Sequence, residues 1–340
     1  MSFQFYFFRR LLFTLPLLLG ITVVAFMIAN AVPADPVTAN LPQNALNDER
    51  MVQAFREKWG LDEPLYIQYW TYLTNILQGD MGTSIRTRQP IVDDIGQHLP
   101  ATMELATLAL VIGITMGISF GVISAVWRNS IVDYLMRVFA LVGVSFPVFL
   151  LALIALNIFY GQLGWVAGPG RLSIGVVPPP AVTNLYLIDS LLAGQMATLG
   201  NAFSHIILPA FVLGSFVSAM IARITRSAML EVIDQDYIRT AYSKGLSSVV
   251  VIMRHALSNA MIPVVTVIGL SYGSLLAGAV LTESIFAWPG IGRYMFRASV
   301  SQDFPAIMGV SMVIALIYVI VNLMVDMLYF VLDPRIRTAD

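Results

Sequence analysis

Cysteine is absent from this chain of 340 residues, and histidine occurs only three times. Without cysteine the chain has no disulfides, no thiolate chemistry and no cysteine-ligated metal. Charged residues are also scarce, at 11% against about 25% in an average soluble domain. The formal net charge of −1 provides none of the basic excess typical of nucleic-acid-binding domains. With 58% hydrophobic residues, this composition indicates an integral membrane protein in contact with the lipid bilayer.

A phosphate-binding loop of the form G-x-x-x-x-G-K-[ST] is missing as well. The chain is therefore not expected to bind ATP, and any energy from ATP and magnesium must be supplied by other subunits. The histidines and the seventeen methionines form no pair at metal-ligand spacing, and methionine is a common packing residue. We expect this chain to bind no metal and no cofactor.

Six apolar stretches are long enough to cross a bilayer, which requires about 20 residues. Proline and glycine inside them are tolerated in membrane helices. The spans predicted are residues 11–32, 102–126, 138–160, 204–225, 261–282 and 305–331. The sequence thus predicts one all-α transmembrane domain over residues 1–340.

The distribution of lysine and arginine predicts that both termini lie in the cytosol. The deciding basic residues lie at the N-terminus, in the loop between spans four and five, and at the C-terminus. Arg9-Arg10, an apolar run and Ala29-Asn30-Ala31 also resemble a cleavable secretory signal. The run of about 20 residues exceeds the 7–15 of a signal core, which favours an uncleaved first span.

Two segments are predicted on the outer, periplasmic side. Residues 33–97 contain one helix that follows Asp48 and ends at Gly60, and a second from Tyr66 to Leu77. Residues 161–203 are rich in glycine and proline, with a short helix near 185–192. Neither segment is large enough to bury a core of its own.

The polar stretch from Arg223 to Pro263 is unusual in so apolar a chain. Asp236 is a candidate helix N-cap, and Lys244 followed by Gly245 is a favourable helix end. A second short helix is predicted after Ser247 or Ser248, with its apolar face formed by Val249, Ile252, Met253, Ala256, Leu257 and Ala260. Helices this short are marginal in water, so they must pack on the membrane domain or on a partner.

Three residues inside the spans are candidates for chemistry. Glu104 and Asp326 are ionisable residues within membrane segments, which are functional candidates in a pathway or gate. Asp326 could pair with Arg335. Ser271 lies in a G-x-S-x-G pattern typical of hydrolase nucleophiles, but the three histidines fall near span ends or in loops. Close helix packing at Gly269, Gly273 and Gly278 is the favoured interpretation of these glycines.

The loop resembles the cytoplasmic loop of permease subunits of binding-protein-dependent ATP-binding-cassette (ABC) importers. In that family the loop carries the signature Glu-Ala-Ala, then any three residues, then Gly. A proline follows the Gly by some eighteen residues. Here Arg239-Thr240-Ala241 precedes Gly245, and Pro263 follows it by eighteen residues. Arg239 and Thr240 replace the Glu and the first Ala of the signature, and this variant resembles the form found in the peptide/nickel branch of the family.

Further segments along the chain resemble the first, B-type permease of dipeptide and oligopeptide importers. They are Phe8-Arg9-Arg10-Leu11, Gly60-Leu61-Asp62, Gly79-Asp80-Met81-Gly82, Thr282-Glu283-Ser284-Ile285-Phe286, Trp288-Pro289-Gly290 and Asp333-Pro334-Arg335-Ile336-Arg337.

This resemblance implies the type I importer permease fold and a multi-pass location in the bacterial inner (plasma) membrane. It also implies a homologous second permease as heterodimer partner, two cytosolic ATP-binding subunits and an external solute-binding protein. The loop 226–260 would then be the coupling loop that docks on the ATPases. Its candidate residues are Asp236, Tyr237, Arg239, Thr240, Ala241, Lys244, Gly245, Leu246, Arg254 and Asn259, with Pro263 at its end.

The sequence leaves the substrate open. Di- or oligopeptides are favoured, with nickel chelates, glutathione or another small solute as alternatives. An intramembrane serine hydrolase using Ser271 and a membrane scaffold that only recruits a cytosolic protein are the rival classes.

Overall fold

The structure is a computed structural model that describes residues 3–31, 37, 41 and 43–332. It is helical throughout the membrane part, with one isolated bridge between Thr83 and Pro90 in the outer segment. The first half contains α1 (Phe3–Ala31), α3 (Gln43–Leu46), α4 (Glu49–Trp59), α5 (Leu65–Leu77), α6 (Ile91–Val126), α7 (Ile131–Ser145), α8 (Val148–Ala155) and the π-helix η1 (Leu156–Gln162). The second half contains α9 (Tyr186–Leu192), α10 (Met196–Ile233), α11 (Asp236–Ser243), α12 (Ser248–Val250), the π-helix η2 (Val251–Leu257), α13 (Ser258–Gly278), α14 (Val280–Ile285), α15 (Ile291–Val300) and α16 (Phe304–Leu332).

The centre of the bundle is the contact between α6 and α10. Gly113, Gly117 and Gly121 recur every fourth residue of α6, on the face that meets α10. A Cβ atom added to Gly117 would lie 2.6 Å from Cβ of Ile221 on α10. Small residues of this kind let two membrane helices approach closely. This pair therefore forms the framework on which the other helices pack.

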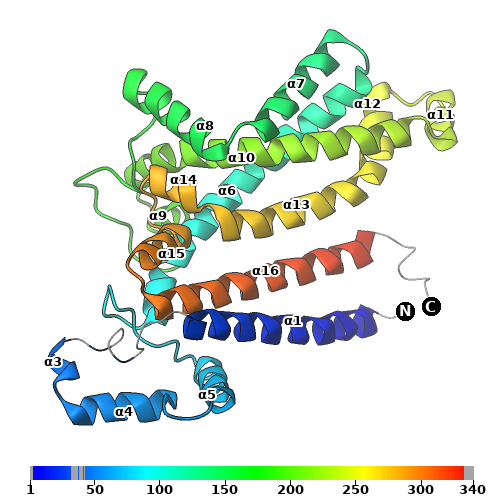
Figure 1. Cartoon of the computed structure of the whole chain (residues 1–340). Coiled ribbons are helices and arrows are strands. Elements are labelled where there is room, and N and C mark those ends of the chain that lie inside the picture. Colours follow the sequence, from blue (N-terminus) through cyan, green and yellow to red (C-terminus); the bar gives the residue numbers. More distant parts are fainter. Residues whose placement is uncertain (1–2, 32–36, 38–40, 42, 333–340) are drawn as a thin grey trace.

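A second layer is built from α13, α16 and α1, which lie below α10 in Figure 1. The predicted close approach at Gly269 and Gly273 is confirmed, because Gly269 meets Val325 of α16 and Gly273 meets Tyr318 of the same helix. Helix α1 packs mainly on α16 and exposes most of its apolar side chains.

Five helices among the described residues are long and apolar enough to span a membrane, and a bent pair makes a possible sixth. That pair, 131–143 with 148–162, bends by 102°. The predicted span 138–160 therefore corresponds to a bent pair of helices rather than to one straight helix. Pro147 lacks a backbone N–H and forces Phe146 into extended backbone (ψ 129°), which ends α7. Spans two and four are longer than predicted, because α6 begins at Ile91 and α10 runs to Ile233.

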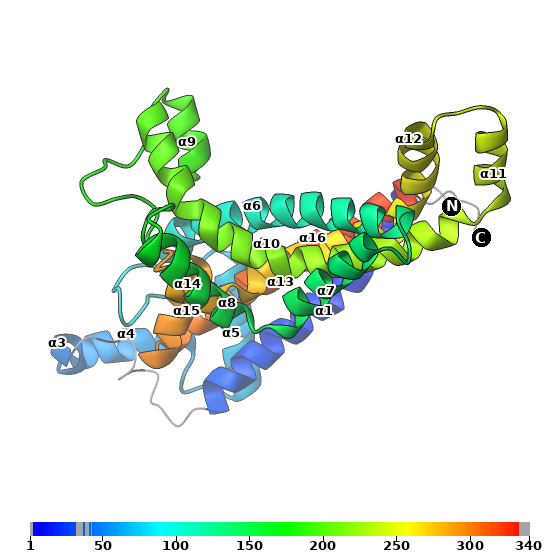
Figure 2. The same ribbon diagram turned by 90° about the horizontal axis from the view of Figure 1, so that it is seen from above.

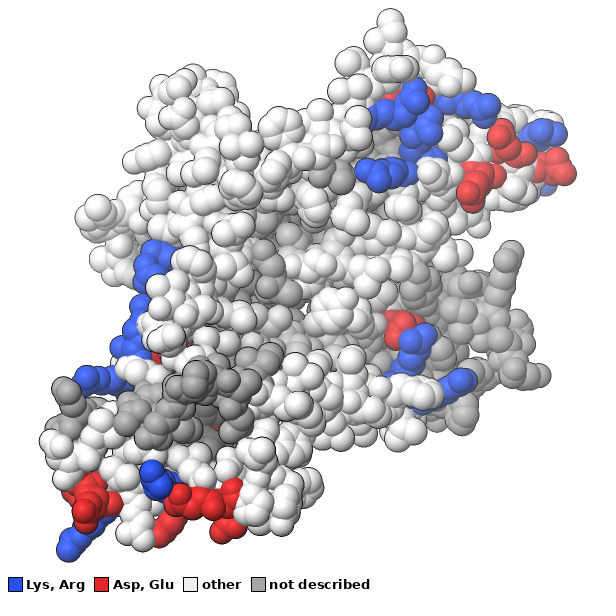
Figure 3. Space-filling model, viewed as in Figure 1, with Lys and Arg blue, Asp and Glu red and all other residues white. Residues whose placement is uncertain are grey.

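Figure 1 shows the two ends of the bundle clearly. The start of α1, the end of α16, α11 and α12 lie at one end, whereas α3–α5, α9, α14 and α15 lie at the other. In Figure 2, α9 and α11 project from opposite ends. Charged side chains gather at these ends and leave a largely uncharged band between them in Figure 3. This arrangement agrees with two cytosolic termini on the side of the coupling loop.

The outer helices follow the predicted capping. The Asp48 side chain accepts a hydrogen bond from the Arg50 backbone N–H, and Gly60 ends α4 in the left-handed region at φ 62°. The turn at Asp80 is closed by a bond from the Gly82 N–H to its carboxylate. An ion pair of 2.7 Å joins Lys58 to Asp80. Helix α9 confirms the short helix predicted near 185–192.

Candidate functional site

Helix α11 forms the first half of the coupling loop. Its first residue is Asp236 and its N-cap is Gln235, so the prediction that Asp236 caps the helix is wrong by one residue. The carboxylate of Asp236 still lies in the first turn, where the helix dipole favours a negative charge. Lys244 is the C-cap and Gly245 follows at φ 81°, as predicted. The left-handed backbone at Gly245 turns the chain from α11 into α12.

The second half of the coupling loop differs from the prediction. No break separates it from span five, because α12, η2 and α13 form one helical run from Ser248 to Gly278. Pro263 lies inside α13 rather than at the start of a new helix. The second half of the coupling loop is therefore continuous with a membrane helix.

The π-helix η2 changes which residues are buried. Val251, Ala256 and Ala260 are buried, whereas Val249 and Met253 are 70% and 52% exposed. A period of 3.6 residues predicts that Val249 and Met253 share one apolar face with Ala256 and Ala260. A π-helix bonds residue i to residue i+5 and has a wider turn, which shifts that face.

Apolar residues of the coupling loop point in two directions. Ile238 and Ala241 of α11 join Val251, Ala256 and Ala260 in a cluster with Ala125 of α6 and with Ala228 and Met229 of α10. This cluster fixes the coupling loop to the inner ends of the two central helices. A second set faces outward and is exposed; we call it the coupling face, and its residues are Tyr237, Tyr242, Leu246, Val249 and Met253.

The remaining predicted residues surround the coupling face without joining it to the bundle. Arg239, Thr240, Lys244, Arg254 and Asn259 are all exposed. Arg239 lies 3.5 Å from the exposed carboxylate of Asp236. The side chain of Asn259 donates to the backbone carbonyl of His255 at 2.6 Å. Charged residues thus lie around an apolar surface, an arrangement typical of protein–protein contacts.

A buried charge cluster that the sequence analysis missed lies next to the coupling loop. Asp133 of α7 is fully buried, and Arg226 of α10 donates two hydrogen bonds to it, at 2.9 and 3.0 Å. Ser124 of α6 donates a third at 2.5 Å, and the Asn129 N–H a fourth. Planar two-point pairing of this kind is geometrically rigid. The inner ends of α6, α7 and α10 are therefore locked together.

The two predicted pathway candidates lie far from each other. Glu104 is buried at the outer end of α6, where it pairs with Arg171 at 2.6 Å and accepts the Leu187 N–H at 2.7 Å. Asp326 pairs with Arg10 of α1 at 3.0 Å. Its predicted partner, Arg335, lies outside the described residues. The structure does not bring Glu104 and Asp326 together in one site.

Glu283 forms a second cluster that the sequence analysis missed. Its carboxylate accepts the Thr102 hydroxyl at 2.6 Å and the Arg293 N–H at 2.8 Å. Thr102 in turn accepts the Ile291 N–H. Burial raises the pKa of Glu283 to about 7, although the hydrogen bonds from Thr102 and Arg293 act in the opposite direction. This carboxyl joins α6, α14 and the start of α15.

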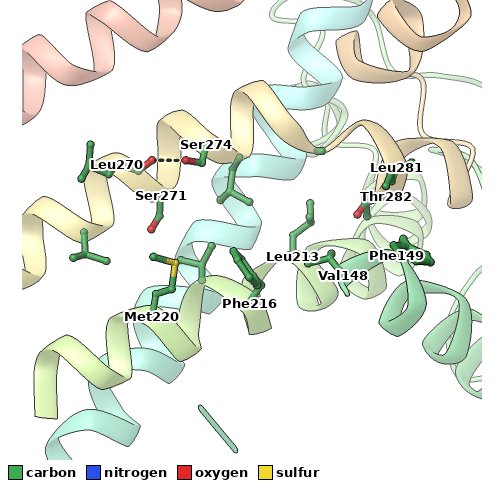
Figure 4. Close-up of a pocket in the computed structure, with 14 residues that line it drawn as sticks. Val148, Phe149, Leu213, Phe216, Met220, Leu270, Ser271, Ser274, Leu281 and Thr282 are labelled. Atoms are coloured by element: carbon green, nitrogen blue, oxygen red, sulfur yellow. Dashed lines mark hydrogen bonds between the residues drawn. The ribbon is translucent and has the colours of Figure 1, made fainter. Parts of the chain in front are cut away.

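A cavity of about 320 Å³ lies between α8, α10, α13 and α14. Figure 4 shows Ser271 and Ser274 on α13, opposite Met220 and Phe216 of α10. None of its lining residues is charged, and none is a histidine. His98 bonds the Pro289 carbonyl instead, and His205 contacts Ser173. Among the described lining residues Ser271 therefore has no base to activate it as a nucleophile.

Comparison with known proteins gives two family matches that together cover nearly the whole chain. Residues 117–338 match the binding-protein-dependent transport system inner membrane component, and residues 3–106 match the N-terminal component of such membrane proteins.

Individual relatives cover as much of the chain. The dipeptide transport system permease protein DppB of Alkalihalophilus pseudofirmus is 45% identical over 97% of this chain and 98% of its own length. The DppB protein of Escherichia coli K12 is 42% identical over 97% of both chains. A glutathione transport system permease, GsiC of Escherichia coli, is 35% identical over 98% of both.

A solved structure supports the fold. An inward-facing form of the MetNI methionine ABC transporter aligns with a TM-score of 0.51 at 15% identity, over 68% of this chain and 93% of that one. A binding-protein-dependent ABC system implies an ATPase and a substrate-binding protein as partners. The predicted fold class, the multi-pass inner-membrane location and the role as a transporter subunit rather than an enzyme are confirmed: the chain belongs to the family of inner membrane components of binding-protein-dependent transport systems.

Proposed function

We propose that this chain is one half of the translocation pathway of an importer for short peptides, paired with a homologous second permease. The observation that carries the substrate class is the full-length similarity to permeases named for dipeptide transport, at 42–45% identity. The glutathione permease relative is more distant, at 35%. Glutathione is itself a short peptide, so the chemistry of the cargo is similar.

The coupling face supports a docking role for loop 226–260. It gathers five exposed large apolar residues at one end of the bundle, next to charged neighbours. Exposed apolar surface is costly in water and marks an interaction site. We propose that each of two cytosolic ATPase subunits docks on one permease, with Tyr237, Tyr242, Leu246, Val249 and Met253 of this chain inserted into the ATPase.

The connection from the coupling face to the membrane supports alternating access. Helix α12 continues through η2 into α13, while α11 follows α10. The Asp133–Arg226 pair links α10 to α7. Closure of the ATPases would therefore move α10 and α13 together with the α6–α7 turn. At the other end, the binding protein would deliver cargo to the surfaces of 33–97 and 161–203. Residues 1–340 of this chain form one transmembrane permease domain in our proposal.

Transport in a reconstituted system tests the substrate class. The full complex, with its second permease, ATPases and binding protein, is placed in proteoliposomes and given ATP. We expect uptake of labelled dialanine at least tenfold above that of a nickel–histidine chelate, with glutathione as a third probe. Nickel uptake without dialanine uptake would overturn the peptide proposal. ATPase recruitment with no uptake of any probe would favour the membrane scaffold.

A further inference from the structure

The cavity between α8, α10, α13 and α14 is apolar apart from three hydroxyl groups. Ser271 and Ser274 come from α13 and Thr282 from α14. In Figure 4, Ser271 and Ser274 lie on α13 with Phe216 and Met220 of α10 opposite, and Thr282 lies at the other end, near Val148 and Phe149 of α8. Its volume of about 320 Å³ is at the lower end of small-molecule sites.

Two of the three hydroxyls have no hydrogen-bond partner among the residues that the structure describes. Ser271 is 6% exposed and Thr282 is 2% exposed, and neither makes a hydrogen bond with its side chain. Ser274 differs, because its hydroxyl donates to the Leu270 carbonyl at 3.0 Å within its own helix. Buried hydroxyls in folded proteins nearly always have a partner. Neither hydroxyl oxygen is among the fully buried polar atoms that lack a partner, so both are open to the cavity, and water or a bound molecule there can supply the partner.

The chemistry of the wall narrows what those contents can be. A hydroxyl both donates and accepts one hydrogen bond or more, so it can meet either the N–H or the carbonyl of an amide. No carboxylate, amine, guanidinium or imidazole lines the cavity. The wall therefore offers no carboxylate or imidazole ligand for a metal and no countercharge for a charged terminus.

We propose that this cavity holds the amide portion of a short peptide in transit, a role that rests on the proposed function. The Ser271 hydroxyl hydrogen-bonds the peptide backbone, and Thr282 offers a second bond at the other end of the cavity. Every peptide contains this amide whatever its side chains, so the site accepts cargo of varied sequence.

Such a site must also release its cargo. A pathway conducts only if binding is strong enough to admit the substrate and weak enough to let it leave. One or two uncharged hydrogen bonds in an apolar wall meet this requirement better than an ion pair would. The G-x-S-x-G pattern at 269–273 thus places a hydrogen-bonding group for the cargo, and its glycines serve helix packing against α16.

Removing the Ser271 hydroxyl tests the site. In proteoliposomes with the complete complex and saturating dialanine-loaded binding protein, we expect Ser271→Ala to lower the dialanine transported per ATP hydrolysed three- to tenfold. Thr282→Val should have a smaller effect in the same direction. The matched control is Ser218→Ala on α10, because Ser218 is equally buried but bonds the Ser215 carbonyl and does not line the cavity.

A second measurement reports occupancy directly. The chain has no cysteine, so Ser271→Cys introduces a single thiol. With cysteine-free partner subunits, we expect a water-soluble maleimide to label it at least threefold more slowly during dialanine transport than with ATP alone. Labelling at Ser299→Cys, exposed on α15, should not change.

The outcomes separate the two proposals. If the wild-type complex moves no dialanine, the proposed function fails. If it moves dialanine while Ser271→Ala matches Ser218→Ala and the labelling rate is constant, the cavity site is overturned. Labelling of Ser271→Cys only by a membrane-soluble reagent, unchanged by transport, would assign the cavity to lipid and also overturn it.

Discussion

The outer end of the bundle and the coupling loop satisfy their polar groups in opposite ways. At the outer end, carboxylates are buried and bonded: Glu104 to Arg171, Glu283 to Thr102, and Asp303 to Ser84 at 2.5 Å. Within residues 236–257 the buried side chains are all apolar, and Asp236, Arg239, Lys244 and Arg254 are exposed. The outer end buries charge in bonded groups, whereas residues 236–257 leave their charges in solvent. Both regions also expose apolar side chains, such as Ile174 and Leu77 at the outer end.

This difference indicates which end holds its own helices together through buried polar contacts. A buried carboxylate without partners is strongly destabilising, so the outer clusters fix one arrangement of α6, α9, α14 and α15. Exposed residues of the coupling face gain nothing until another surface covers them. The outer end is therefore fixed by its own polar contacts, whereas the coupling face is, in our proposal, half of an interface.

Breaking an outer pair should have the largest effect on stability. Arg171→Ala leaves Glu104 buried beside the Leu187 N–H without its cation, and removes the guanidinium that lies 3.5 Å from the Tyr186 ring centroid. We expect a loss of about 3–5 kcal/mol in the free energy of unfolding. Thermal unfolding of the detergent-solubilised complex measures it.

The control replaces both partners. Glu104→Gln combined with Arg171→Met should recover most of the lost stability, because no unpaired charge remains buried. An Arg171→Ala variant as stable as the wild type would show that the outer end does not depend on this pair.

The stability of the outer end should depend on pH through the titration of Glu283. Its pKa is raised from 4.5 to about 7 by burial, so between these values the folded protein holds a proton that the unfolded chain has released. The contribution of Glu283 to the free energy of unfolding therefore falls as the pH rises from 4.5 to 7. At ~1.4 kcal/mol per pKa unit, the total decrease is about 3 kcal/mol. Thermal midpoints across this range measure the slope. Glu283→Gln should have a shallower slope, and equal slopes would contradict the assignment.

A change in the coupling loop should cost the least stability and the most transport. Gly245→Val forces a β-branched residue into the left-handed region, at roughly 1–2 kcal/mol. A Cβ at Gly245 meets nothing within 4 Å, so the effect is confined to the backbone turn. We expect peptide uptake below a tenth of the wild-type rate and ATP hydrolysis no longer coupled to it.

Gly245→Asn is the matched control, because asparagine tolerates left-handed backbone. It should keep most of the uptake. Wild-type transport by Gly245→Val would remove the basis for assigning the loop to coupling.

Local patterns were enough to predict several helix ends and the approximate positions of most spans. Asp48 and Gly60 bound α4, and Lys244-Gly245 ends α11, because capping depends on residues within one turn. The errors arose where two patterns competed. Pro147 breaks a stretch whose hydropathy reads as continuous, and η2 changes the helical period that placed Val249 and Met253.

By itself, the sequence determined that this protein is a membrane permease with a polar loop around Gly245 and no phosphate-binding loop motif. Composition, hydropathy and local motifs act over short distances along the chain, so they can be read directly from it. Only the tertiary structure decided that Glu104 meets Arg171, that Asp133 meets Arg226 across 93 residues, and that Ser271 faces a cavity without a base. These pairings depend on which helix faces come together, and burial then makes each unpaired polar group costly enough to select its partner.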